Sequence, residues 1–344
     1  MRVHLQLTGD PHGVADDVVA LSRLGVDGVF TFEGPHDVFA PLIRATAVEE
    51  ARDLDLMTNV AIAGPRSPLH LAHMAWDLQS YSGGRFRLGL GSQIRPHIEK
   101  RYGSAWGRPA ARLGETVRAI GAIFDTWENG TPLDFRGEFT THTLMPPNFV
   151  PGPTGHGRPA VLMGGLGPVT TRTAAEVADG LLVMPFHSRA HLAERTLPAV
   201  EDGLSRRERD GAFSVIGQAM VAVGSDEGSL RAAVDGVAML IAFYGSTPAY
   251  RPVLDASGRG DLQPELNALS KQGRFAEMRS LITDDDVATF AVVGSPAECA
   301  TEIHDRFGGF ASEICCYFPH YEPVSSDLSA LVGHLQDAVV PSAG

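Results

Sequence analysis

The amino-acid sequence predicts a single (β/α)8 barrel, a fold also called a TIM barrel. Strand-like and helix-like segments alternate along most of the 344 residues, which is the pattern of a parallel α/β protein. Eight segments have the short apolar character of buried strands. A doubly wound open sheet is the competing fold, but residues 8–13, after the first strand, lack the glycine spacing of a dinucleotide-binding turn.

The predicted strands are short runs bounded by glycine, proline or polar residues, as expected of strands buried between helices. The fourth of them alternates apolar residues with arginine and glycine. Their predicted ranges are 3–7, 28–32, 56–62, 86–91, 160–163, 180–184, 215–223 and 311–318.

The predicted helices lie between these strands and have typical end signals. The first, at 14–24, places Val18 and Leu21 on an apolar face, and Gly25 ends it. The second starts with Pro41 in its first turn. The others are predicted at 41–52, 69–81, 109–127, 168–178, 189–210 and 328–339.

Residues 238–286 depart from the regular alternation. They contain Tyr244, Tyr250 and a glycine-rich break at 258–260. The sequence predicts helical material inserted between the seventh and eighth strands, where long insertions often cover a site. The whole chain, 1–344, is predicted to be one domain.

Charge and cysteine usage exclude several protein classes. The formal net charge is −13, which argues against a nucleic-acid partner and gives no sign of membrane-surface binding. The three cysteines, Cys299, Cys315 and Cys316, and the scattered histidines lack the spacing of a metal site. The N-terminus lacks the apolar core of a signal peptide and no apolar run reaches membrane-spanning length, so we expect a cytoplasmic protein.

Residues 82–93 read Ser-Gly-Gly-Arg-Phe-Arg-Leu-Gly-Leu-Gly-Ser-Gln. Gly89 and Gly91 remove side chains from one face of this strand, which suits the close approach of backbone or ligand. Ser92 and Gln93 follow at the strand's exit, the active-site face of a barrel. The alternative is a buried strand with a tight glycine packing point.

Several motifs together resemble the bacterial luciferase-like superfamily of flavin and deazaflavin oxidoreductases. The resemblance spans most of the chain and is closer to the branch that uses the deazaflavin coenzyme F420 than to the branch that uses FMN. It is carried by residues 82–91, by Thr58-Asn59-Val60 with Pro65-Arg66-Ser67-Pro68, by Phe135-Arg136-Gly137-Glu138-Phe139 and by Gly164-Gly165.

The resemblance implies a barrel with the cofactor ring at the C-terminal ends of the strands. It implies a non-proline cis peptide bond in the third strand beneath the ring, and the matching bond is Asn59–Val60. Ser92 and Gln93 are then expected near the ring. The alternative for the third strand is an ordinary buried strand.

The cofactor's phosphate needs donors, and a glycine loop before a helix supplies them. The backbone N–H groups there are expected to point at the phosphate, with the helix dipole behind them, and Arg66 is expected to reach the same phosphate. The alternative is a plain strand-to-helix turn. The residues concerned are Gly164, Gly165, Gly167 and Thr170.

The loop after the second strand holds the candidate acid–base residues. Histidine exchanges protons near neutral pH, so His36 is the first candidate, with Glu33 or Asp37 orienting it. The alternative is that these residues only cap the next helix. Sugar-phosphate dehydrogenases of the F420 branch instead have Asp followed at once by His here and a glutamate where this chain has Ile94, which argues against that activity.

The resemblance therefore implies an F420-dependent oxidoreductase that moves hydride between the deazaflavin and a small organic substrate. The first alternative is an FMN-dependent monooxygenase that receives reduced flavin from a partner reductase. The second is a flavin- or deazaflavin-binding protein without turnover. The resemblance also suggests a homodimer.

Overall fold

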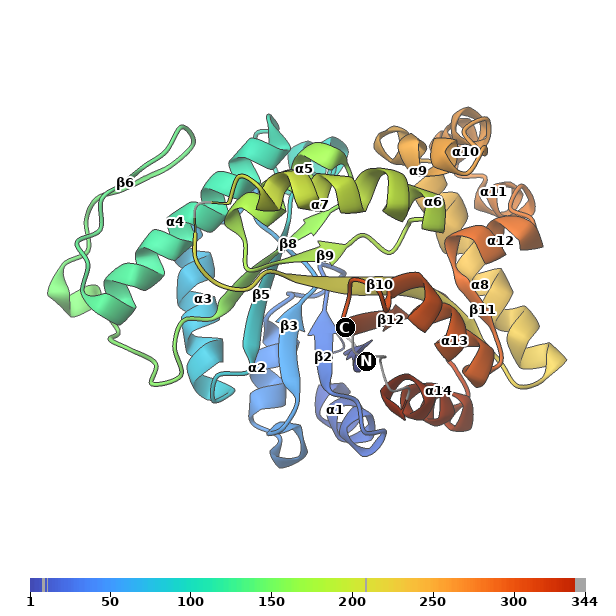
Figure 1. Cartoon of the computed structure of the whole chain (residues 1–344), viewed down its shortest axis with the longest axis horizontal. Helices are drawn as coiled ribbons and strands as arrows, with labels where there is room; N and C mark the ends of the chain where they lie inside the picture. Colours follow the sequence, from blue (N-terminus) through green and yellow to red (C-terminus); the bar gives the residue numbers. More distant parts are fainter. Residues whose placement is uncertain (8–9, 11, 208, 338–344) are drawn as a thin grey trace.

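The computed structural model describes residues 1–7, 10, 12–207 and 209–337, and it confirms the barrel. Eight parallel strands are arranged in a ring, and pairing of β10 with both β9 and β12 closes it (Figure 1). In order around the ring these strands are β1 (Arg2–Gln6), β2 (Gly28–Thr31), β3 (Asp55–Thr58), β5 (Phe86–Gly91), β8 (Ala160–Gly165), β9 (Gly180–Val183), β10 (Ser214–Val223) and β12 (Glu313–Tyr317).

Each of these eight strands overlaps a predicted one, and the third shows the largest difference. The prediction was one continuous strand at 56–62, whereas the chain forms β3 and then a separate short strand, β4 (Ala61–Ile62). The break falls at Asn59–Val60, which is a cis peptide bond. The cis bond implied by the family resemblance is therefore confirmed.

Helices surround the barrel and cover its outer face (Figure 1). Alternate strand residues such as Leu56, Leu88 and Val161 point outward into one continuous apolar core. The covering helices are α1 (Val14–Arg23), α2 (Ala40–Thr46), α3 (Pro68–Tyr81), α4 (Pro109–Asn129), α5 (Pro168–Val177), α7 (Leu197–Leu204), α13 (Pro296–Phe307) and α14 (Ser325–Asp337).

Three predicted helices differ from the observed ones. The helix predicted at 41–52 ends at Thr46 and is followed by a 3-10 turn, η1 (Glu49–Ala51). The helix predicted at 189–210 consists of α6 (Arg189–His191), a π-turn, η4 (Leu192–Thr196), and α7. The closing helix, predicted to reach Val339, is α14, and Val339 lies outside the described residues.

Residues 227–294, which we call the cap segment, lie between β10 and α13. The segment begins before Ala238 and runs past Asp286. Its first helix packs on Met220 and Ala222, on the inward-facing side of the extension of β10, so it lies over the barrel rather than in the outer ring. Its elements are α8 (Glu227–Gly245), η5 (Pro248–Tyr250), α9 (Arg251–Ala256), α10 (Leu262–Lys271), α11 (Phe275–Ser280), α12 (Asp284–Phe290) and β11 (Val292–Gly294).

The expected hairpin is present as β6 (Phe135–Arg136) and β7 (Thr141–His142), and it projects from the barrel (Figure 1). Glu115 of α4 anchors its turn, because this carboxylate accepts hydrogen bonds from the backbone N–H groups of Glu138, Phe139 and Thr140 at 2.6, 2.7 and 2.8 Å.

Among the described residues, no single helix is long and apolar enough to cross a membrane. Helix α8 and residues 248–256 reach that length and apolar composition only when taken together, and the chain bends sharply between them.

Candidate functional site

The barrel is filled through its middle and open at the C-terminal ends of its strands. The middle layer consists of fully buried inward-facing side chains, among them Phe30, Met57 and Leu182. Above it several inward-facing residues are half-buried or exposed, whereas Met220 and Ala222 of β10 are fully buried under the cap segment. We call this region the mouth, and in barrels of this kind it is where active sites form. Its residues include Gln6, Phe32, Val60, Gly164, Met184 and Tyr317.

Two glycines make room for Val60 in the centre of the mouth. A Cβ atom on Gly91 would lie 2.4 Å from Cγ2 of Val60, and one on Gly164 would lie 3.3 Å from Cγ1. A Cβ on Gly89 would lie 1.9 Å from the backbone oxygen of Thr58. Gly89 therefore serves close backbone packing, whereas Gly91 and Gly164 let the Val60 side chain stand between two strands.

A hydrogen-bonded network holds Asn59 beneath this position. Gln218 donates from Nε2 to Oδ1 of Asn59 at 2.9 Å, and the Tyr317 hydroxyl donates to Oε1 of Gln218 at 2.9 Å. His187 bonds through Nε2 to the Gln218 carbonyl at 2.8 Å, and burial lowers the pKa of His187 to about 3, so its imidazole is neutral. The Asn59 amide nitrogen Nδ2 is buried and has no partner among the described residues.

Sequence reasoning missed Gln218 and Tyr317. The available signal was Gln218 itself, a polar residue in the middle of an otherwise apolar strand. A buried polar side chain requires partners, and here they come from strands that lie far apart in the sequence.

The structure brings Glu33 and Arg66 together as an ion pair at the rim of the mouth. Oxygen atoms of Glu33 accept from Nη1 and Nη2 of Arg66 at 2.7 and 2.9 Å, and the carboxylate also accepts from the Ile62 N–H at 3.0 Å. Burial alone would lower the pKa of Arg66, but the hydrogen bond and charge of Glu33 raise it. Each predicted site residue thus has the other as its main partner.

His36 and Asp37 lie in the same loop, but their side chains have different surroundings. Asp37 accepts hydrogen bonds from the N–H groups of Phe39 and Ala40 at 2.8 and 3.0 Å, so it caps the start of α2. Its other oxygen lies 3.8 Å from Arg66. His36 is exposed on the rim, where its imidazole is accessible to a bound molecule.

The three glycines of the predicted phosphate-binding loop lie in three different environments. Gly164 faces Val60 inside the mouth, whereas Gly165 faces outward, where a Cβ would lie 3.0 Å from Oγ1 of Thr171. Gly167 is exposed, precedes Pro168 as the cap of α5, and has open space around it. Thr170 is half-buried in the first turn of α5. The accessible N–H groups are therefore those of Gly167 and the first turn of α5.

Ser92 and Gln93 follow β5 at the same rim. Gln93 has a left-handed backbone, with φ of 57°, and its Oε1 accepts a hydrogen bond from the Ile94 N–H at 3.1 Å. Ser92 is half-buried and lines a small pocket together with Gly64 and Trp106.

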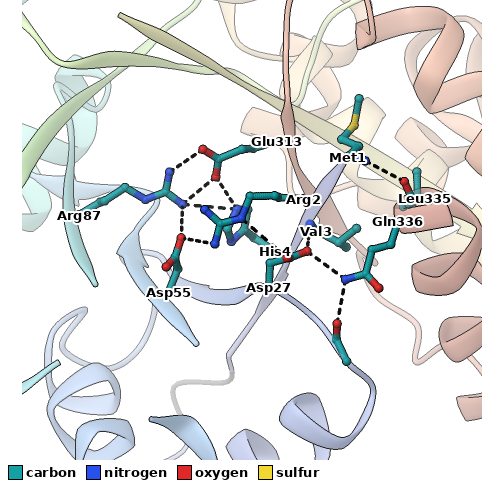
Figure 2. Close-up of polar contacts among 11 residues, drawn as sticks. Met1, Arg2, Val3, His4, Asp27, Asp55, Arg87, Glu313, Leu335 and Gln336 are labelled. Atoms are coloured by element: carbon teal, nitrogen blue, oxygen red, sulfur yellow. Dashed lines mark hydrogen bonds and ion pairs between the residues drawn. The ribbon is translucent and has the colours of Figure 1, made fainter. Parts of the chain in front are cut away.

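A second polar cluster fills the opposite, N-terminal end of the barrel (Figure 2). Glu313 bonds to His4 Nε2 at 2.6 Å and to Arg87 Nη1 at 3.0 Å, and Asp55 bonds to Arg2 at 2.8 Å. His4, Asp55 and Glu313 are close enough to ligate a metal ion. The guanidinium groups already balance both carboxylates, so we interpret the cluster as an ion-pair network that joins β1, β3, β5 and β12.

We expect Arg66→Met to lower the free energy of unfolding by about 2–3 kcal/mol, because it leaves the Glu33 carboxylate largely buried and unpaired. The double variant Glu33→Gln with Arg66→Met should recover part of this loss, since it also removes the unpaired charge. Urea denaturation of the single and double variants measures both effects. Equal stability of wild type and Arg66→Met would show that the pair contributes nothing.

Comparison with known proteins identifies the family. The model of the luciferase-like monooxygenase family matches residues 2–313. An uncharacterized protein of Mycobacterium tuberculosis is 47% identical over 305 residues, which are 88% of this chain and 89% of that protein. The 5,10-methylenetetrahydromethanopterin reductase of Archaeoglobus fulgidus is 26% identical over 262 residues, or 73% and 75% of the two chains.

Solved structures show the same fold at low sequence identity. The coenzyme F420-dependent tetrahydromethanopterin reductase of Methanopyrus kandleri has a TM-score of 0.78 at 16% identity and 98% coverage of both chains. The oxygenating constituent of 3,6-diketocamphane monooxygenase of Pseudomonas putida, in complex with FMN, has a TM-score of 0.66 at 15% identity, covering 99% of this chain and 100% of that one. With the family match over most of its length, this chain belongs to the luciferase-like monooxygenase family.

Proposed function

We propose that the protein is an F420-dependent oxidoreductase that transfers hydride between the deazaflavin and a small organic substrate at the mouth of the barrel. The observation that carries the proposal is the open mouth around Val60, with Gly91 and Gly164 on either side of it. One similar protein supports the choice of cofactor: the Methanopyrus kandleri enzyme, which is described as F420-dependent.

The residues at the mouth fit such a cofactor. Val60 presents a small, half-buried apolar surface on which a flat ring would lie. At the rim, Gly167 and the first turn of the ten-residue helix α5 offer free N–H groups with the helix dipole behind them, which suits a phosphate. Thr170 adds a hydroxyl. Ser92 and Gln93 stand at the rim beside the end of β5.

When bound, the deazaflavin supplies the carbon that gives or accepts hydride. The chain's own residues set the geometry around it: Gln218 and Tyr317 hold Asn59, and thereby the backbone that carries Val60. The cap segment, packed over β10, excludes water from one side of the mouth. His36 on the rim is the residue we propose to exchange the accompanying proton at its imidazole.

Parallel titrations with F420 and FMN, each oxidised and reduced, test the proposal by fluorescence. We expect F420 to bind more tightly than FMN, and hydride transfer to fall in His36→Gln while F420 affinity stays unchanged. Preference for reduced FMN would instead indicate the FMN-dependent monooxygenase. F420 binding with no turnover of any substrate would indicate a binding protein, and binding of neither cofactor would overturn the assignment of the mouth.

A further inference from the structure

The short strand β4 has a neighbouring strand on one side only. It pairs with β5, and the N–H of Ala63 continues that ladder by donating to the Gly91 carbonyl at 3.0 Å. On the other side β2 ends at Thr31, whose carbonyl accepts from the Asn59 N–H at 2.6 Å. Beyond Asn59, no strand among the described residues supports the backbone that carries Val60 on the β2 side.

The side chains of Glu33 and Arg66 bond to both backbone groups of Ile62 in β4. The Glu33 carboxylate accepts from the Ile62 N–H at 3.0 Å, and Nη1 of Arg66 donates to the Ile62 carbonyl at 2.9 Å. Nη1 and Nη2 also donate to the two carboxylate oxygens of Glu33, at 2.7 and 2.9 Å. The ion pair therefore satisfies the N–H and the C=O of Ile62 as a neighbouring strand would satisfy them.

The local chain brings both side chains to this position. Glu33 follows the end of β2, and Arg66 folds back over β4 because its N–H donates to the Ala63 carbonyl at 3.0 Å and closes a turn. Only 8% of the Glu33 side chain and 22% of the Arg66 side chain are exposed. Charge-assisted hydrogen bonds that are shielded from water in this way hold a backbone more strongly than neutral hydrogen bonds do.

The backbone on the other side of Val60 is anchored independently. Gln218 donates to Oδ1 of Asn59 at 2.9 Å, and the Tyr317 hydroxyl holds Gln218 in turn. Val60 thus lies between two anchored residues: Asn59, which is held by β10, and Ile62, which is held by Glu33 and Arg66. Loss of the second anchor would release the backbone on one side of Val60 only.

We propose that Glu33 and Arg66 are positioning residues that fix Val60 in the mouth by bonding to Ile62. In this role their charges serve the backbone of β4 and each other, rather than a proton or a phosphate of a bound molecule. The inference rests on the proposed function, because the position of Val60 matters to a cofactor ring that lies on it. A shift of β4 changes both how tightly the ring binds and how it is oriented.

Amide hydrogen exchange of the protein without cofactor tests the contact itself. The double variant Glu33→Met with Arg66→Met removes both side-chain partners of Ile62 and leaves no charge unpaired, so it should be more stable than Arg66→Met. We expect the Ile62 N–H to exchange at least about tenfold faster than in the wild type, the value of one charge-assisted hydrogen bond. The internal reference is the N–H of Leu56 in β3, which donates to the Arg85 carbonyl at 2.9 Å and should follow global stability alone.

Fluorescence titration with F420 tests the consequence for the ring. The double variant should bind F420 about three- to tenfold more weakly than the wild type, and the emission of the bound cofactor at saturation should be shifted. An ion pair that only stabilised the fold would change neither quantity in a variant that remains folded. The matched control, Arg95→Met with Glu99→Met, removes an exposed pair at 3.0 Å and should leave F420 affinity and Ile62 exchange unchanged.

Unchanged Ile62 exchange in the double variant would overturn the proposal. Equal F420 affinity and emission in the wild type and the double variant would overturn this inference alone and leave the proposed function intact. Faster Ile62 exchange, combined with no binding of F420 or FMN to the wild type, would overturn the proposed function alone. If the double variant fails to fold, Glu33→Gln decides. It keeps the shape of the side chain but leaves one oxygen for the N–H groups of Arg66 and Ile62, so Ile62 must still exchange faster and F420 must bind more weakly.

Discussion

Replacing Arg87 with methionine is expected to lower the free energy of unfolding by about 3–5 kcal/mol. Arg87 bonds to Glu313 at 3.0 Å and to Asp55 at 3.4 Å, and its side chain is only 15% exposed. Without it, the partners that remain among the described residues are His4 for the Glu313 carboxylate, inside the barrel, and Arg2 for Asp55. Methionine fills similar space, so the loss reports on charge rather than on a cavity.

Denaturant unfolding of Arg87→Met and of a matched variant, Arg95→Met, measures the effect. Arg95 pairs with Glu99 at 3.0 Å on the surface, with 68% of its side chain exposed. Exposed pairs contribute about 0–1 kcal/mol, so Arg95→Met should remain close to wild type. Similar losses of unfolding free energy in both variants would mean that the buried ion pairs of Arg87 stabilise the protein no more than the exposed pair of Arg95.

The pH dependence of the free energy of unfolding provides a second test of Arg87→Met. Burial alone would raise the pKa of Glu313, but hydrogen bonds from His4 and Arg87 outweigh it and lower that pKa to about 2. The folded value lies below the ordinary value of 4.5, so the stability that Glu313 contributes is complete above pH 4.5 and is lost as the pH falls towards 2. In Arg87→Met this acid-dependent loss should be smaller, because the folded pKa rises.

The barrel strands could be predicted because each carries its signal locally. A strand buried on both sides, such as β9, is a continuous apolar run, and helices on either side give the parallel arrangement. The ends of β3 could not be located in the same way. Residues 56–62 are apolar enough for one strand, and the interruption at Asn59 depends on Gln218 and Tyr317, which only the closed barrel brings near.

That α8 begins at Glu227, before the insertion predicted at 238–286, could not be predicted either. Its residues have the apolar character of a helix that covers a barrel, and the sequence before it is a regular strand. The difference arises because β10 is ten residues long and continues past its neighbours, where it pairs with β11. The apolar residues of α8 then meet Met220 and Ala222 over the mouth, and α13 covers the outside.

In the candidate site, too, the residue types could be predicted from the sequence but their contacts could not. Residue types identified the loop after β2, but no local pattern pairs Glu33 with Arg66, because the two residues lie 33 positions apart. Asp37 could be interpreted either as an acid–base residue or as a cap, and its two backbone hydrogen bonds show that it caps α2.

Replacing Gly91 with alanine is expected to weaken binding of F420 by about tenfold or more. The new Cβ would lie 2.4 Å from Cγ2 of Val60 and 3.4 Å from its Cβ, so the Val60 side chain must rotate or its backbone must move. A β-branched side chain has few alternative rotamers, and overpacking of this kind costs about 1–3 kcal/mol. Because Val60 is the surface proposed to carry the ring, the change alters the ring's position as well as local packing. Fluorescence titration with F420 measures it.

Two further variants separate the ring surface from general damage to the barrel. Gly164→Ala meets Val60 at 3.3 Å, a contact that a small shift relieves, so its affinity should stay within about threefold of wild type. Val60→Ala in the Gly91→Ala background removes the clashing methyl groups and should restore part of the affinity. Unchanged F420 binding in Gly91→Ala, with a normal unfolding transition, would place the ring somewhere other than on Val60. Restored F420 affinity in the double variant would show that the clash between the alanine introduced at position 91 and the Val60 side chain causes the loss.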